Sequence, residues 1–182
     1  MKSREIVDLA AEIVQIDGLG KISFRNLADA VGVKSSSVHY HFRTKADLIE
    51  TLICDYSVNF EKTLNELDEQ DFSVRDRILW FAGIFKEVLS NDKLCLCGVM
   101  AVSVNELNEP SRNALSDFFS KAGKWLETTL KEGRGEIKMD LSTKDLARLI
   151  LSGLEGSILL DRVDRGDKNL QSQLAFIEAL FE

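Results

Sequence analysis

The segment 23–47, SFRNLADAVGVKSSSVHYHFRTKAD, constrains the fold of this chain more than any other part of it. Its pattern predicts two short helices joined by a tight turn at Gly32, with a third helix beginning directly afterwards. Apolar residues recur at helical spacing on one face of each short helix, which indicates a small shared core and a helix-turn-helix. These core contacts are assigned to Leu27, Ala28, Val31, Val33, Val38 and Phe42.

The second short helix, 35–42, carries hydroxyl, imidazole and phenol side chains on its outward face. Such groups, on a helix held rigid by a neighbour, are suited to contact the base edges and phosphates of DNA. We therefore interpret this helix as a candidate recognition helix. Its outward residues are Ser35, Ser36, Ser37, His39, Tyr40 and His41.

The run LADAVGVKSSSVHYHFRTKADLI resembles the DNA-binding motif of the TetR family of transcriptional regulators. Several positions match together, over about the first 50 residues, which makes the resemblance specific. Departures at Lys34, Ser35, Ser36 and His39 are expected to alter the base sequence that is recognised. The matching positions are Leu27, Ala28, Gly32, Val33, Tyr40, His41, Phe42, Lys45 and Leu48.

The resemblance implies a function and a set of partners. It implies a ligand-responsive repressor that binds a near-palindromic, double-stranded DNA operator as a homodimer. Arg25 and Lys45 are expected to hold phosphates beside the recognition helix. In proteins of this kind the last two helices usually form a four-helix dimer bundle, and the central helices often enclose an effector pocket.

Composition agrees with an all-α protein of about nine helices. The chain has 182 residues, of which 45% are hydrophobic, and its one proline is Pro110. We expect a helix-turn-helix DNA-binding domain at 1–47 and a helical effector-binding and dimerisation domain at 48–182. The sequence has no run of 18 apolar residues and no signal-peptide pattern at its beginning, and its three cysteines suggest reduced thiols. A cytoplasmic location is therefore expected, without a membrane span.

Charge is distributed unevenly along the chain. Residues 1–47 carry a net charge of +1, whereas residues 48–182 carry −8. Phosphate contacts act over about a Debye length of 8–10 Å, so a locally basic face suffices for DNA binding. The acidic remainder is expected to orient the molecule with its motif toward DNA.

Cap signatures place most of the helices. Ser or Thr followed three residues later by an acidic residue marks a helix start at Thr44, Ser73 and Ser142, and Ser23 caps the helix that it precedes. Pro110 suits a first helical turn. The stretch GRGEIKM is expected to be a loop. The helices are expected at 2–16, 24–31, 35–42, 44–69, 78–89, 110–131, 143–162 and 167–181.

The helix at 143–163 is apolar nearly all round, so it must be covered on more than one side. Small residues along it permit close approach by another helix. A two-fold interface formed by this helix and the last one is the favoured interpretation, because closed dimers are the commonest assembly, although burial within a monomer is an alternative. The predicted interface residues are Leu149, Ser152, Gly153, Gly156, Leu160, Leu174 and Ile177.

The middle of the chain offers two weaker hypotheses. Aromatic and Met side chains at helical spacing are usually plain core, but Trp80, Phe85, Met100 and Phe119 are candidates for an apolar effector pocket. Cys95 and Cys97 are candidates for a thiol sensor, with simple structural packing as the alternative. No cofactor or metal site is expected, because a metal needs three or four ligands.

Catalysis has little support in the sequence. It contains no nucleophile elbow, phosphate loop or metalloprotease helix. The chain is therefore not expected to be an enzyme. The competing class is an α-helical enzyme or small-molecule binding module in which the N-terminal motif is accidental.

Overall fold

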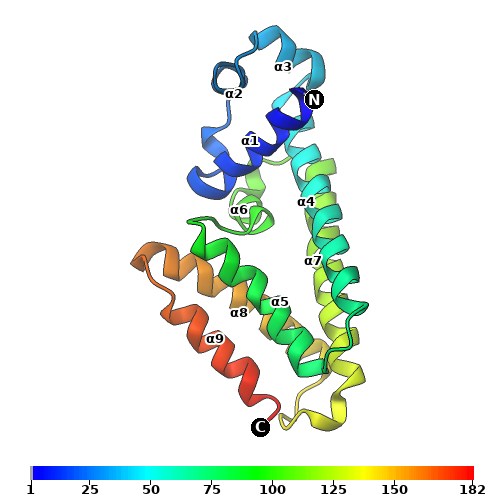
Figure 1. Cartoon of the computed structure of the whole chain (residues 1–182). Coiled ribbons are helices and arrows are strands. Elements are labelled where there is room, and N and C mark those ends of the chain that lie inside the picture. The colour runs from blue at the N-terminus through cyan, green and yellow to red at the C-terminus, as the bar shows by residue number, and fades with distance from the viewer. Residues whose placement is uncertain (1) are drawn as a thin grey trace. The chain divides into compact units, whose positions relative to one another are not determined.

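A computed structural model describes residues 2–182, and this part of the chain is all-α, as predicted, with nine α-helices and no strand (Figure 1). None of the helices in this range is long and apolar enough to cross a membrane. Three short 3-10 turns, Leu19–Lys21 (η1), Val104–Glu106 (η2) and Arg134–Glu136 (η3), connect some of them. The helices are Lys2–Asp17 (α1), Phe24–Val31 (α2), Ser35–His41 (α3), Lys45–Asp68 (α4), Val74–Ser90 (α5), Leu96–Val102 (α6), Glu109–Glu132 (α7), Thr143–Asp164 (α8) and Lys168–Ala179 (α9).

The predicted caps are confirmed. The hydroxyl of each serine N-cap accepts a hydrogen bond of 3.1 Å from the backbone N–H three residues later, at Ser23, Ser73 and Ser142. At the start of α4 the bonds are reciprocal: Asp47 N–H donates to Thr44 Oγ1 at 3.1 Å, and Thr44 N–H donates to Asp47 Oδ2 at 3.0 Å. These side chains satisfy N–H groups that a helix start leaves without a partner.

The sequence did not predict α6. This helix has only seven residues and is buried from Leu96 to Met100, so it has no polar face and no amphipathic period to detect. Cys95 is its N-cap residue. The stretch expected to be a loop, GRGEIKM, contains the short turn η3.

The helices form two compact units. Unit 1 comprises the chain up to Asn59 together with Cys95–Phe118, and unit 2 comprises Phe60–Leu94 with Phe119–Glu182. The helices α4 and α7 each run from one unit into the other, and the predicted domain boundary at residue 47 stays a prediction. The short helix α6 also packs against α1.

Unit 1 is held together around α1, which packs against α2, α3 and α6. Arg4 on α1 donates from its guanidinium to Asp55 on α4 at 2.9 Å. The apolar core beneath this exposed pair gives unit 1 most of its stability, since surface ion pairs contribute little. Its fully buried members include Ile6, Ala10, Val14, Leu27, Val38, Leu48 and Ile53.

In unit 2, α5, α8 and α9 pack against one another (Figure 1). The ring of Phe81 stacks on Trp125 of α7, with 5.4 Å between ring centroids and 14° between the ring planes. Phe60 meets Phe81 edge-on at 5.8 Å. Large aromatic rings bury much apolar surface, so this cluster is the centre of the unit 2 core.

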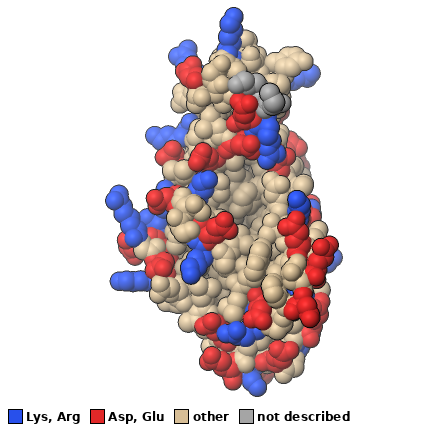
Figure 2. All heavy atoms as spheres, in the orientation of Figure 1, with Lys and Arg blue, Asp and Glu red and all other residues tan. Residues whose placement is uncertain are grey.

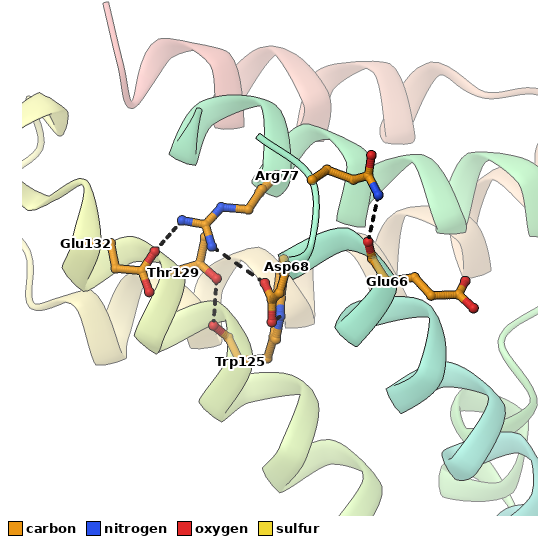
Figure 3. A network of polar contacts seen from close by, with 7 residues as sticks. Glu66, Asp68, Arg77, Trp125, Thr129 and Glu132 are labelled. Carbon is orange, nitrogen blue, oxygen red and sulfur yellow. Dashed lines mark hydrogen bonds and ion pairs between the residues drawn. The ribbon is translucent and has the colours of Figure 1, made fainter. Parts of the chain in front are cut away.

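A polar network joins α4, α5 and α7 beside that cluster (Figure 3). Arg77, whose side chain is largely buried, forms ion pairs with Glu132 and with Asp68, the latter at 3.5 Å. Trp125 Nε1 donates to the same Asp68 carboxylate at 2.9 Å. Because a guanidinium that leaves water needs carboxylate partners, these contacts fix Arg77 and with it the spacing of the three helices.

A buried carboxylate joins α8 to α9. Asp161, on α8, accepts hydrogen bonds from the backbone N–H groups of Asn169 at 2.9 Å and Leu170 at 2.8 Å. The side-chain amide of Asn169 donates to it at 2.7 Å. Asp167, the N-cap residue of α9, makes no capping bond of its own. Asp161 therefore caps α9 from the neighbouring helix, where the positive end of the helix dipole also favours an anion.

Replacing Asp161 with alanine is expected to lower the free energy of unfolding by about 2–4 kcal/mol, because buried N–H groups of α9 lose a charged acceptor. Urea denaturation at pH 7, followed by circular dichroism, measures this change. Asp164→Ala, which removes an exposed carboxylate from the same helix, is the matched control and should change it by less than about 0.5 kcal/mol. Equal losses in the two variants would contradict the capping role.

The same carboxylate makes stability depend on pH. Burial by itself would raise the pKa of Asp161, but the hydrogen bonds from Asn169 and Leu170 outweigh burial and hold the pKa below its ordinary value of 3.8. A depressed folded-state pKa stabilises the fold above the unfolded-state pKa, and this contribution disappears as the pH falls through the folded-state value. The free energy of unfolding should therefore fall below pH 3.8 more steeply in the parent than in Asp161→Asn.

Candidate nucleic-acid interface

A glycine turn sets the geometry of α2 and α3. Gly32 has a left-handed backbone, with φ 69° and ψ 41°, which ends α2. Its N–H donates to Asp29 O at 3.3 Å, and the N–H of Val33 donates to Ala28 O at 2.9 Å. These two bonds are those of a Schellman C-cap, in which glycine is favoured because it has no Cβ. The chain is thereby redirected into α3.

The candidate recognition helix is the observed α3, and its predicted outward face is largely open to solvent. Tyr40 is 84% exposed, whereas Val38 on the opposite side is fully buried. Ser37 is half-buried. The ring of His39 packs edge-on against Phe24 of α2, with 4.7 Å between centroids, which fixes its direction. The exposed members of the predicted set are Ser35, Ser36, His39, Tyr40 and His41.

The two predicted phosphate contacts have different surroundings. Arg25, in the first turn of α2, is exposed. Lys45 is half-buried, and its ammonium donates to the backbone carbonyl of Leu19 at 3.1 Å. An ammonium has three donors, so Lys45 can hold η1 to α4 and still donate to an anion.

Two further cations flank α3, Lys34 and Arg43, and a third, Lys21, lies earlier in unit 1. Lys34 is the N-cap residue of α3, Arg43 follows the helix, and Lys21 lies in η1. All three side chains are exposed. For Lys34 and Arg43, the position in the sequence directly next to the recognition helix was the signal available. Figure 2 shows Lys and Arg side chains projecting from the end of unit 1 that carries α2 and α3.

The four candidate pocket residues are not alike in position. Met100 is fully buried in α6 of unit 1, and Phe85 is buried in unit 2. Phe119 is half-buried, and Trp80 is 42% exposed. Trp80 alone of the four lines a hollow described below, which it shares with residues of α4 and the α4–α5 connection.

The two candidate sensor thiols lie in unit 1 and are both buried. Tyr56 Oη lies 3.8 Å from Cys95 Sγ. Cys97 is within α6. Burial limits the access of oxidants to a thiol, which favours structural packing over a thiol sensor.

The predicted dimer residues divide into two groups. Leu149, Ser152 and Leu160 are exposed on α8, and Gly156 and Leu174 are half-buried. A Cβ on Gly156 would meet no atom of the subunit within 4 Å.

Gly153 and Ile177 belong instead to the packing within the subunit. A Cβ on Gly153 would lie 2.5 Å from the side chain of Gln173 on α9, and Ile177 is fully buried. The sequence analysis places both in the dimer interface, because a sequence period cannot show which side of α8 its own neighbour α9 covers.

Residues 6–52 match a known family. The model of the bacterial regulatory proteins, tetR family, matches residues 6–52, which include α2, the turn and α3. The HTH-type transcriptional repressor DhaR of Mycobacterium sp. (strain GP1) is 22% identical, and the match covers 98% of this chain and 90% of DhaR. The nucleoid occlusion factor SlmA of Shewanella sp. (strain W3-18-1) is 29% identical, with 86% and 81% covered.

A solved structure extends the likeness to the whole fold. The TetR transcriptional regulator of Legionella pneumophila is 28% identical and superposes with a TM-score of 0.90, over 98% of this chain and 96% of that one. The TetR motif of residues 6–52 therefore lies in a helical fold that also occurs in a TetR-family regulator. Residues 6–52 therefore form a DNA-binding domain of the TetR family, and the chain is a DNA-binding transcriptional regulator similar over its whole length to members of that family.

Proposed function

We propose that this protein is a repressor that binds a near-palindromic operator as a homodimer, and that α3 reads the bases. The proposal rests chiefly on the exposed polar face of α3, held by the Gly32 turn on one side and by the Thr44–Asp47 capping box on the other. Mobility shift of genomic fragments at low salt tests it. Binding that weakens as salt rises is expected, because cations that contact phosphates displace counterions.

In the proposed complex, α3 lies in the major groove. Tyr40, His39 and His41 face base edges, and the hydroxyls of Ser35 and Ser36 contact bases or phosphates. Arg25, Lys34 and Lys45 hold phosphates on either side. Because phosphate contacts carry no sequence information, the two groups of residues should respond differently to substitution.

Lys34→Ala is expected to weaken binding to all DNA sequences alike and to reduce the slope of log affinity against log salt by about one unit. Tyr40→Ala should change the preferred bases and leave that slope nearly unchanged. Selection from genomic fragments, followed by affinity measurements at several salt concentrations, gives both quantities.

Lys138→Ala is the matched control for Lys34→Ala, since it removes an exposed lysine from unit 2. It should leave the salt slope as in the parent. If Lys34→Ala and Lys138→Ala lower the slope equally, only net charge matters and the assignment of α3 to the DNA interface is wrong.

The proposed dimer forms through one side of α8. Exposed apolar side chains recur there at helical spacing, with Leu160 58% exposed and Val163 80% exposed. Ser152 and Gly156 lie on the same stripe and permit another helix to approach closely. A row of exposed apolar residues on one helix is costly in water, and a second α8 related by two-fold symmetry would cover it.

Gly156→Glu is expected to raise the dissociation constant of the dimer at least about tenfold, because a carboxylate would be buried in a close helix contact. A Cβ at this position meets nothing inside the subunit, so the fold of each subunit should survive. Sedimentation velocity over a concentration series measures the change. Operator affinity should fall with it, since one recognition helix would contact only one half-site.

Gly123→Glu, on α7, is the matched control, because it tests whether a glutamate in place of a helical glycine weakens the dimer wherever it is introduced. A Cβ there also meets nothing within 4 Å, and both changes replace a helical glycine by glutamate. The control should remain as dimeric as the parent. A monomeric parent at micromolar concentration, or equal weakening by both substitutions, would rule out this interface.

A further inference from the structure

A hollow in unit 2 has an unusual combination of aromatic and acidic walls. It has a volume of about 250 Å³ and is formed by the last turns of α4, the α4–α5 connection and α5. This volume is slightly below the usual range of about 300–1,000 Å³ for ligand sites, so it suits only a very small molecule. Its lining residues are Thr63, Glu66, Leu67, Gln70, Phe72 and Trp80.

The two aromatic side chains of the hollow remain accessible to solvent. Phe72 is 45% exposed and Trp80 is 42% exposed, whereas Phe81 and Phe85 on the same helix as Trp80 are buried. The face of an aromatic ring attracts cations, and the indole of tryptophan does so most strongly. The walls are thus suited to an organic cation with apolar substituents.

The charge around the hollow favours the same ligand. Glu66 contributes a carboxylate to it. Residues 60–72 contain five acidic side chains and one cation, Lys62, but Glu61 pairs with Lys121 and Asp68 with Arg77, so the excess negative charge comes from Glu66, Glu69 and Asp71. Glu66 pairs with Lys62 at 3.6 Å, but both side chains are well exposed, so this pair is weak and a bound cation can compete with it. The C-terminus of α4, the negative end of its dipole, adds to the field. Figure 2 shows acidic side chains gathered along the side on which α4 and α7 run.

The polar groups of the hollow leave room for a second contact. The side-chain amide N–H of Gln70 donates to the backbone carbonyl of Glu66 at 3.2 Å, which leaves the amide oxygen of Gln70 to accept. A ligand that joins a quaternary ammonium to a short polar tail matches both parts of the lining. A neutral molecule of the same shape matches only the apolar part.

We propose that this hollow binds a small organic cation, a quaternary ammonium or a substituted amine, through Trp80, Phe72 and Glu66. The ammonium lies against the indole and the phenyl ring, and the Glu66 carboxylate balances its charge. The amide oxygen of Gln70 accepts a hydrogen bond from a hydroxyl of the ligand.

Choline and 3,3-dimethylbutan-1-ol form a matched pair of probes, because they differ in having nitrogen or carbon at the centre of the same trimethyl group. Calorimetric titration of the full chain, without DNA, gives both affinities. Choline should bind at least about tenfold more tightly, which corresponds to a cation–π contribution of ordinary size. Equal affinities, or no binding of choline at millimolar concentrations, would overturn the proposal.

Two pairs of variants test the residues. Trp80→Leu should weaken choline binding about tenfold, whereas Trp80→Phe, which keeps an aromatic face, should stay within about threefold of the parent. Glu66→Gln should weaken it severalfold, and Glu69→Gln, an equal change of charge outside the lining, should not. Equal effects within either pair would show that the contacts named here do not form the site. Since no DNA is present, the result is independent of the proposed operator complex.

Discussion

The left-handed backbone at Gly32 is the constraint on which the functional surface of unit 1 depends. A Cβ at this position would meet no atom within 4 Å, so the need for glycine is conformational and not steric. A residue with a Cβ would occupy this conformation at a cost of about 1–2 kcal/mol. Without the turn, α2 would not end at Val31, and the direction of α3 relative to the core residues Leu27 and Val38 would not be fixed.

Local signals predicted the helices well because their causes are local. A serine or threonine that accepts from an N–H three residues later needs only its own turn, so Ser23, Ser73 and Ser142 could be assigned from the sequence. The Gly32 turn and the buried face of α3 could be assigned for the same reason. The helix α6 could not, since its seven residues, buried from Leu96 to Met100, form no polar face that would reveal a period.

Contacts between separate helices could not be predicted from such local sequence signals. Asp161 stands in the last turns of an apolar helix, where a carboxylate would ordinarily be read as solvated, and Asp167 is the residue that local rules place at the cap of α9. The structure gives the capping bonds to Asp161, eight and nine residues before its partners. Lys45 and Gly153 show the same limit: their contacts, with Leu19 O and Gln173, depend on how separate helices pack.

The helix α4 runs from the recognition helix of unit 1 to the proposed cation site of unit 2. It begins at the Thr44–Asp47 capping box, directly after the recognition helix, and it ends at Asp68, which is held by Arg77 and Trp125. Three lining residues of the proposed cation site, Thr63, Glu66 and Leu67, belong to its last turns. A hydrogen-bonded helix transmits a displacement better than a loop does. A cation that shifts the last turns of α4 therefore acts on the same helix that begins directly after α3. A ligand response therefore needs a differential affinity of the cation for two positions of α4, and a coupling of about 2 kcal/mol would change DNA affinity roughly thirtyfold.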